Sequence, residues 1–131
     1  MDRRLALWGP VVLDMAAIFY VSSLHQAPLP PGVGDKPTHL LAYLLLAVLV
    51  VRAVAGGLPA RVSWTKALLA LAMTIGYAVS DELHQYFVPG RSAELGDLYA
   101  DSIGAGMGTI ACWAWGIISP ALPPRASRDE L

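Results

Sequence analysis

Three groups of polar residues interrupt an otherwise apolar chain, and their types suit proton transfer or the binding of an anion. The first group consists of Asp35, Lys36, His39 and Tyr43. From Lys36 onward these residues recur every three or four positions, which places an ammonium, an imidazole and a phenol on one face of a helix. We expect Asp35 to be the N-cap of that helix, with its carboxylate accepting a hydrogen bond from the Thr38 N–H.

The second group lies near the end of the third apolar stretch and consists of Asp81, Glu82, His84 and Gln85. Two adjacent carboxylates in an apolar helix repel each other and resist ionisation, so we expect one of them to be protonated or neutralised by a partner. Such a carboxylate is suited to act as a general base. The sequence therefore offers Glu82 or Asp81 as a base and His84 or His39 as a proton shuttle.

The third group follows a turn and consists of Arg91, Ser92, Asp97 and Asp101. The two aspartates are one helical turn apart, and their stripe continues through Gly104 and Gly108. This Gly-x-x-x-Gly spacing predicts that another helix approaches closely and brings its backbone against the aspartates. We expect Arg91 to bridge the acidic helix ends or, together with Lys36, to clamp an anionic group.

The elements that must position these groups are four apolar stretches separated by proline and glycine, at residues 5–24, 38–55, 65–87 and 98–119. Each approaches the roughly 20 residues that a helix needs to cross a hydrocarbon core about 30 Å thick. Charged residues make up 15% of the chain, against about 25% in soluble domains. The sequence predicts an all-α integral membrane bundle of four transmembrane helices at residues 1–120 and a short polar cytoplasmic tail at 121–131.

The distribution of basic residues predicts the orientation, because Lys and Arg near membrane ends stay on the cytoplasmic side. With four spans, both termini and the middle loop share one side of the membrane. That side holds Arg3, Arg4, Arg52, Arg61, Lys66, Arg125 and Arg128. Only Lys36 and Arg91 fall on the other side. Both termini are therefore predicted to be cytoplasmic, and the three polar groups to face the extracytoplasmic side.

Other sequence features narrow the possible functions. The formal net charge is -1, so no basic surplus favours nucleic acid as a partner. Histidine and carboxylate ligands suit several divalent metals, but no close spacing such as His-x-x-x-His occurs, so no metal ligands are assigned and the cofactor is left unknown. Asp14, in the middle of the first stretch, is expected to pair with Arg52 of the second.

The polar motifs resemble those of the VanZ-like family. The motif Asp-Lys-x-x-His-x-x-x-Tyr occupies residues 35–43, and Asp-Glu-x-His-Gln-x-Phe-x-Pro-Gly-Arg-Ser occupies residues 81–92. Asp97 and Asp101 then precede a glycine-rich helix; at position 101 many relatives have Asn. The resemblance extends from about residue 14 to residue 115. It implies a multi-pass protein of the bacterial cytoplasmic membrane, whose namesake contributes to teicoplanin resistance, but it supplies no established reaction.

Two hypotheses stay open from the sequence. In the first, an extracytoplasmic site acts on a lipid-linked or cell-wall-related substrate. Its candidate catalytic residues are Asp81, Glu82, His84 and His39, and its candidate substrate-binding residues are Asp35, Lys36, Tyr43, Gln85, Arg91, Ser92, Asp97 and Asp101. In the second, a non-catalytic protein binds membrane lipid or shields against a glycopeptide antibiotic, and the polar clusters only hold the bundle together. A transporter is less favoured, since four helices without an inverted repeat would have to oligomerise.

Overall fold

The computed structural model describes residues 2–26 and 28–119, and this part of the chain folds into four helices without strands. The helices are α1 (Arg3–Ser22), α2 (Asp35–Ala55), α3 (Trp64–Tyr86) and α4 (Leu95–Ile118). Each predicted apolar stretch coincides with one helix to within a few residues. The all-α, four-helix prediction is therefore confirmed. The predicted tail at 121–131, with Arg125 and Arg128, lies outside the described residues.

The ends of α2 show how local sequence sets the helix boundaries. At its C-terminus Gly56 adopts a left-handed conformation with φ of 80°, and the Gly57 N–H donates to the Arg52 carbonyl at 2.8 Å. Glycine is favoured there because it lacks the Cβ that makes this conformation costly. At the N-terminus the prediction was wrong: Gly34 is the N-cap, without a side-chain capping bond, and Asp35 is the first helical residue.

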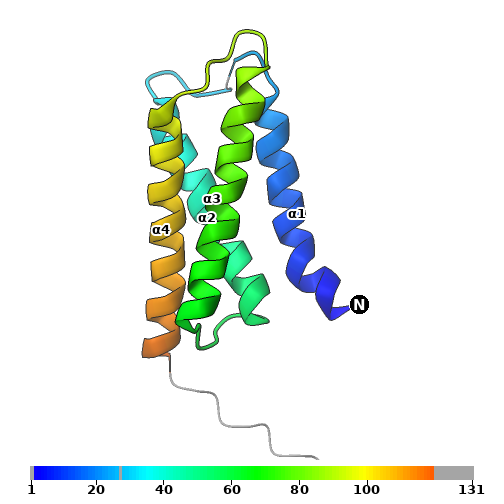
Figure 1. Ribbon diagram of the computed structural model, residues 1–131, viewed down its shortest axis with the longest axis vertical. Helices are drawn as coiled ribbons and strands as arrows, with labels where there is room; N and C mark the ends of the chain where they lie inside the picture. The colour runs from blue at the N-terminus through cyan, green and yellow to red at the C-terminus, as the bar shows by residue number, and fades with distance from the viewer. Residues whose placement is uncertain (1, 27, 120–131) are drawn as a thin grey trace, which may run out of the picture.

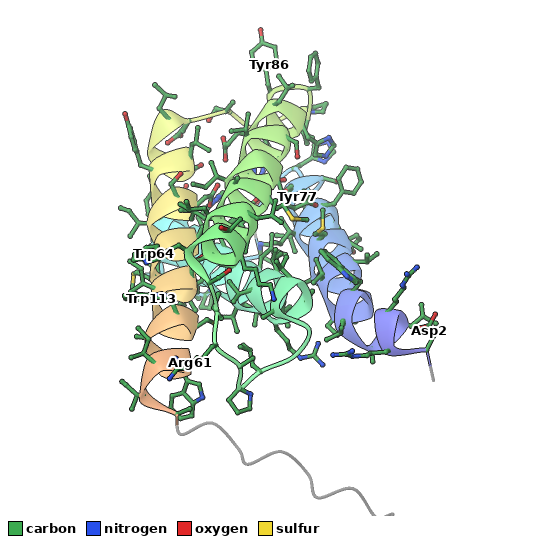
Figure 2. All side chains as sticks on the ribbon, turned by 60° about the horizontal axis from the view of Figure 1, so that its bottom comes forward. Asp2, Arg61, Trp64, Tyr77, Tyr86 and Trp113 are labelled. Carbon is green, nitrogen blue, oxygen red and sulfur yellow. The ribbon has the colours of Figure 1, made fainter. Side chains whose placement is uncertain are left out.

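Helices α1 and α3 run in one direction, and α2 and α4 run in the opposite direction (Figure 1). The α1–α2 and α3–α4 connections lie together at one end of the bundle, and the α2–α3 connection and the N-terminus lie at the other (Figure 1). Figure 2 shows Tyr86 at the first end, and Asp2 and Arg61 at the second. We call the first end, where α1 and α3 finish and α2 and α4 begin, the polar end.

The closest helix contact joins α2 to α4 through glycines. A Cβ at Gly104 would overlap the Leu40 carbonyl oxygen, and one at Gly108 would lie 2.6 Å from the Leu44 carbonyl oxygen. The two backbones can approach this closely only because glycine has no side chain. The close approach predicted from the Gly-x-x-x-Gly spacing is confirmed, and α2 is the helix that makes it.

Large apolar side chains cover the outer surface of all four helices. Leu13, Leu41, Leu83 and Ile110, one from each helix, are each more than 60% exposed. Many exposed large apolar side chains on every helix are unusual for a soluble monomer and indicate an apolar partner or a membrane. By length and composition, α1 and α2 are each apolar enough to cross a membrane.

Candidate functional site

The three polar groups predicted from the sequence converge at the polar end, where α2 and α4 both begin. The Lys36 ammonium forms ion pairs with Asp97, with Glu94 at 2.9 Å and with Asp35 at 3.9 Å. The hydrogen bond from Lys36 lowers the pKa of the Glu94 carboxyl below its usual value. Acidic groups are also favoured here because helix N-termini carry a partial positive charge. Lys36 therefore ties α2 to the start of α4.

A second cluster lies deeper, between α2, α3 and α4. His39 Nδ1 is 2.9 Å from Asp101 Oδ1, and the Glu94 backbone N–H donates to Glu82 Oε2 at 3.1 Å. His39 Nε2 is 3.7 Å from Asp97 Oδ2. One ligand atom from each of His39, Glu82 and Asp101 lies within 4.8 Å of the others, so these three residues could hold a metal ion. We call these three residues the buried triplet.

Asp81 and Glu82 are neighbours in sequence but bond to different groups. The Tyr43 hydroxyl donates to Asp81 Oδ2 at 3.0 Å, and both residues are buried. Glu82 instead accepts from the Glu94 backbone. The repulsion expected between adjacent carboxylates is reduced because each has its own hydrogen-bond donor.

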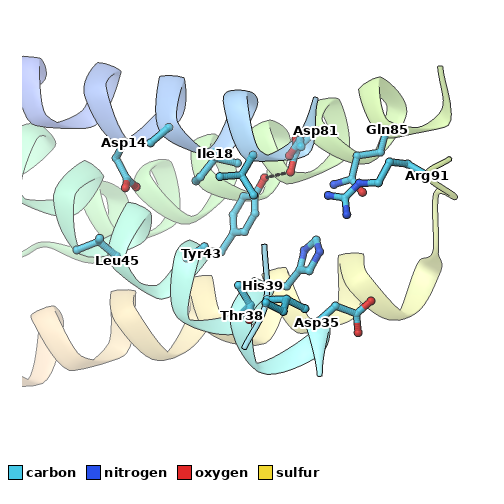
Figure 3. Close-up of a pocket in the computed structure, with 15 residues that line it drawn as sticks. Asp14, Ile18, Asp35, Thr38, His39, Tyr43, Leu45, Asp81, Gln85 and Arg91 are labelled. Atoms are coloured by element: carbon cyan, nitrogen blue, oxygen red, sulfur yellow. Dashed lines mark hydrogen bonds between the residues drawn. The ribbon is translucent and has the colours of Figure 1, made fainter. Parts of the chain in front are cut away.

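A cavity of about 300 Å³ opens beside these clusters, lined by α1, α2, α3 and the two connections at the polar end. Its walls include Ala17, Ile18, Val21, Ala42 and Leu45, and its polar residues include Asp35, His39, Tyr43, Asp81, Gln85 and Arg91. Figure 3 shows Arg91 and Gln85 at one end of this cavity and Asp14 towards the other. The cavity thus combines apolar walls with a few polar groups, most of them at the Arg91 end, as small-molecule sites do.

Arg91 is the basic residue of this cavity, and it does not bridge the acidic helix ends. Within the described residues no carboxylate lies within 4.0 Å of its guanidinium, and its buried Nε has no hydrogen-bond partner. Lys36 lines a different hollow, on the α4 side of α2, and is paired with three carboxylates. The structure therefore forms neither the bridge between acidic helix ends nor the Lys36–Arg91 clamp.

Two further candidates lie outside the cavity. The Ser23 hydroxyl is 3.0 Å from His84 Nε2, and the His84 ring stacks on Phe19 with ring centroids 4.5 Å apart. These contacts join α3 to the end of α1. The Ser92 hydroxyl donates to Glu94 Oε1 at 3.3 Å on the surface. Neither side chain is among those that line the cavity.

Sequence reasoning missed two acidic residues of the site. Arg52 donates to the Ala6 carbonyl at 3.1 Å, so the predicted pair with Asp14 was wrong. Asp14 lines the cavity instead, and its buried Oδ2 has no hydrogen-bond partner. Glu94 was not among the candidates, although its place three residues before Asp97 at the start of a helix pointed to a role at the helix end.

The family comparison covers most of the chain and the whole polar end. A family model described as VanZ/LLP1 matches residues 15–118. Comparisons with curated proteins and with solved structures give no match. The matched residues include the C-terminal part of α1 from residue 15, all of α2 and α3, and α4 to its last residue. The chain belongs to the VanZ/LLP1 family.

Proposed function

We propose that this VanZ/LLP1 protein crosses the bacterial cytoplasmic membrane with four helices and binds an anionic amphiphile in the cavity at its polar end. The amphiphile is of the lipid-linked or cell-wall-related class. Through it the protein contributes to resistance against glycopeptides such as teicoplanin. The proposal requires binding only and assigns no catalytic step. The cavity explains how the amphiphile is recognised but does not indicate a bond that would react.

The observation that carries the proposal is an arginine without a carboxylate partner at the polar end of an apolar cavity. Arg91 lines the cavity, and its Nε is buried without a hydrogen-bond partner. A guanidinium donates two parallel hydrogen bonds to a phosphate or carboxylate. The walls from Ile18 and Ala42 suit a hydrocarbon chain. A molecule with an anionic head and an apolar chain matches the Arg91 end of the cavity and its apolar walls.

The membrane-spanning arrangement is supported by helix length and by the outer surface. The four helices contain 20, 21, 23 and 24 residues. At about 1.5 Å per residue, such lengths span a hydrocarbon core about 30 Å thick. The apolar outer surface extends over α3 and α4 as well as α1 and α2. The charged residues of α3 and α4 cluster near helix ends, where a membrane tolerates them.

The orientation is supported by the positions of the basic residues in the bundle. Arg3 at the start of α1, Arg52 near the end of α2 and Lys66 at the start of α3 belong to the end opposite the polar end. Basic residues are retained on the cytoplasmic side. In this orientation both termini are cytoplasmic, and the cavity opens near the outer surface of the membrane.

The binding experiment compares two probes that differ only in the head group, farnesyl phosphate and farnesol, with the purified protein in detergent. We expect the wild-type protein to bind farnesyl phosphate at least about tenfold more tightly, because a hydrogen bond to a charged group contributes about 1.5–3 kcal/mol. Arg91→Gln should remove this preference and leave farnesol binding unchanged. Isothermal titration calorimetry measures both dissociation constants.

The matched control is Arg61→Gln, which removes an exposed arginine at the opposite end of the bundle. This variant should keep the wild-type preference, and circular dichroism should show that all three proteins are folded. The proposal fails if wild-type protein does not distinguish the two probes. It also fails if folded Arg91→Gln still prefers the phosphate.

The orientation is tested by cysteine labelling in intact cells, in a Cys112→Ala background that removes the native thiol. A cysteine at Ala93, in the α3–α4 connection, should react with a thiol reagent that does not cross the membrane. A cysteine at Ala60, in the α2–α3 connection, should react only after the cells are opened. The reverse labelling pattern would show that the proposed orientation is wrong.

The resistance part is tested by expressing the chain in a teicoplanin-sensitive bacterium. We expect the minimal inhibitory concentration of teicoplanin to rise with wild-type protein and not with Arg91→Gln at equal membrane abundance. If wild-type protein does not raise this concentration, the proposed role in resistance is wrong. The proposed binding of the amphiphile is still decided by the calorimetric measurement.

A further inference from the structure

The buried triplet lacks the positive charge that its neighbours have. Lys36 neutralises the carboxylates at the surface, pairing with Asp97 and Glu94. Within the described residues no Lys or Arg side chain lies within 4.0 Å of the carboxylate of Glu82 or Asp101. Two carboxylates in a low-dielectric interior need compensating positive charge.

Both carboxylates have one oxygen that is buried without a hydrogen-bond partner. Glu82 is 7% exposed and Asp101 is fully buried. Glu82 Oε2 and Asp101 Oδ1 have partners, but Glu82 Oε1 and Asp101 Oδ2 have none. Leaving a buried polar atom unpaired is costly, so such atoms point to a ligand that completes the site.

The third member of the triplet, His39, supplies a nitrogen ligand and a route by which an ion can reach the site. The His39 side chain is 14% exposed and also lines the cavity, which gives an ion a route to the two carboxylates. The three residues come from α2, α3 and α4, and each offers a ligand atom within 4.8 Å of the other two. An ion there would join three helices.

We propose that His39, Glu82 and Asp101 bind one divalent transition-metal ion of the zinc or manganese class. Two carboxylates and a neutral imidazole balance the charge of such an ion. Mixed nitrogen and oxygen ligands suit zinc and manganese, whereas calcium and magnesium take oxygen ligands. Metal ligands must be deprotonated, so the ion would take His39 as the neutral imidazole and both acids as carboxylates. This proposal is independent of the amphiphile proposed for the cavity.

The experiment measures metal binding by the full chain, purified in detergent with a tag that contains no histidine. After chelator treatment and its removal, ZnCl₂ or MnCl₂ is added, and isothermal titration calorimetry gives stoichiometry and affinity. We expect one ion of zinc or manganese per chain, with a higher thermal unfolding temperature. No stoichiometric binding of either ion by the folded wild-type protein would overturn the proposal.

The variants His39→Gln, Glu82→Gln and Asp101→Asn each remove one ligand with little change in volume. Each should weaken binding at least about tenfold, since even residues that only support metal ligands cost about 10- to 100-fold in affinity. The matched control is Glu94→Gln, which removes a neighbouring carboxylate outside the triplet and should keep wild-type affinity. Wild-type affinity in the three ligand variants would overturn the proposal.

A spectroscopic measurement on the wild-type protein covers the case in which the variants do not fold. Manganese-loaded protein, labelled with ¹⁵N in histidine, should show coupling of the electron spin to one histidine nitrogen by pulsed electron paramagnetic resonance. Cobalt-loaded protein should show visible absorption bands of a bound, low-symmetry ion. Absence of histidine coupling together with absence of the cobalt bands would overturn the proposal.

Discussion

The interface between α2 and α4 and the space between α1 and α2 differ in how the helices meet. Nine residues of α4 are buried, three of them glycines, and the α2 backbone packs against two of these, Gly104 and Gly108. Only Val11 and Ser22 of α1 are buried, and the cavity lies beside this helix. The same small bundle therefore contains one close-packed interface and one open one.

The two regions therefore have different roles: the close-packed interface holds the helices together, and the open space can admit a ligand. The close-packed pair positions His39 beside Asp101, whose buried carboxylate requires a fixed partner. The loosely packed α1 supplies an apolar wall, and regions with few buried contacts open at lower free-energy cost. A molecule can thus enter beside α1 without separating α2 from α4. Substitutions on the side of α2 that faces α4 should lower stability, whereas those on the side that faces the cavity should weaken ligand binding.

The largest effect is expected at the closest contact between α2 and α4. In Gly104→Ala the new methyl group would overlap the Leu40 carbonyl oxygen and push the helices apart. We expect a loss of stability of about 3 kcal/mol or more, at the upper end for overpacking. Thermal unfolding in detergent, followed by circular dichroism, measures the change.

The control for this prediction is Gly106→Ala on the same helix, where a Cβ meets nothing within 4 Å. This variant should be as stable as wild type or more stable by about 0.5–1 kcal/mol, because alanine favours the helix more than glycine does. Equal destabilisation of the two variants would show that the glycines of α4 do not set the interface.

A smaller effect is expected from one substitution made on two faces of α2. Ala47 is fully buried and faces Gly108, whereas Ala42 lines the cavity. Ala47→Leu should lower stability by about 2 kcal/mol through overpacking. Ala42→Leu should leave the unfolding temperature nearly unchanged but weaken binding of farnesyl phosphate, because the added carbons fill the cavity. Unfolding and binding measurements on both variants make the comparison.

The reverse result would contradict the division between the two faces. If Ala42→Leu destabilises the protein as much as Ala47→Leu, the space beside α1 is as closely packed as the interface with α4. If Ala42→Leu is stable and binds farnesyl phosphate as wild type does, the cavity is not where the probe binds.

The smallest effect is expected at the exposed rim of the α2–α4 pair. Lys36 lowers the pKa of Glu94 in the folded protein, so this carboxylate stabilises the fold above its unfolded pKa. Its contribution is lost as the pH falls through the folded pKa. Glu94→Gln should therefore lower the unfolding temperature slightly at neutral pH, and the difference should shrink in acid. A difference that stays constant with pH would exclude the ion pair as its cause.

Local sequence predicted the helices and the glycine contact correctly because both depend on nearby residues. Apolar stretches bounded by proline and glycine are sufficient to indicate helices. The spacing of Gly104 and Gly108 indicates a close approach without identifying the partner helix. The predicted cap at Asp35 was wrong by one residue, since the chain can start the same helix from Gly34.

Contacts between helices were less predictable because sequence spacing carries little information about them. Arg52 bonds to the backbone of α1 rather than to Asp14, and Lys36 takes the carboxylates expected for Arg91. The residues of the buried triplet lie on three helices, so no short metal-binding pattern marks them. The cavity results from the loose packing of α1, and no single sequence motif predicts that packing.

The parallel pairing of α2 and α4 also sets the order in which the protein can be completed. His39 and Asp101 are 62 residues apart, and the chain must pass through α3 before α4 can start beside α2. During synthesis the three earlier helices of the bundle therefore expose their ionisable groups before α4 covers them. Because α4 closes the charged cluster, a ribosome that stalls before α4 leaves a chain with an unfinished site.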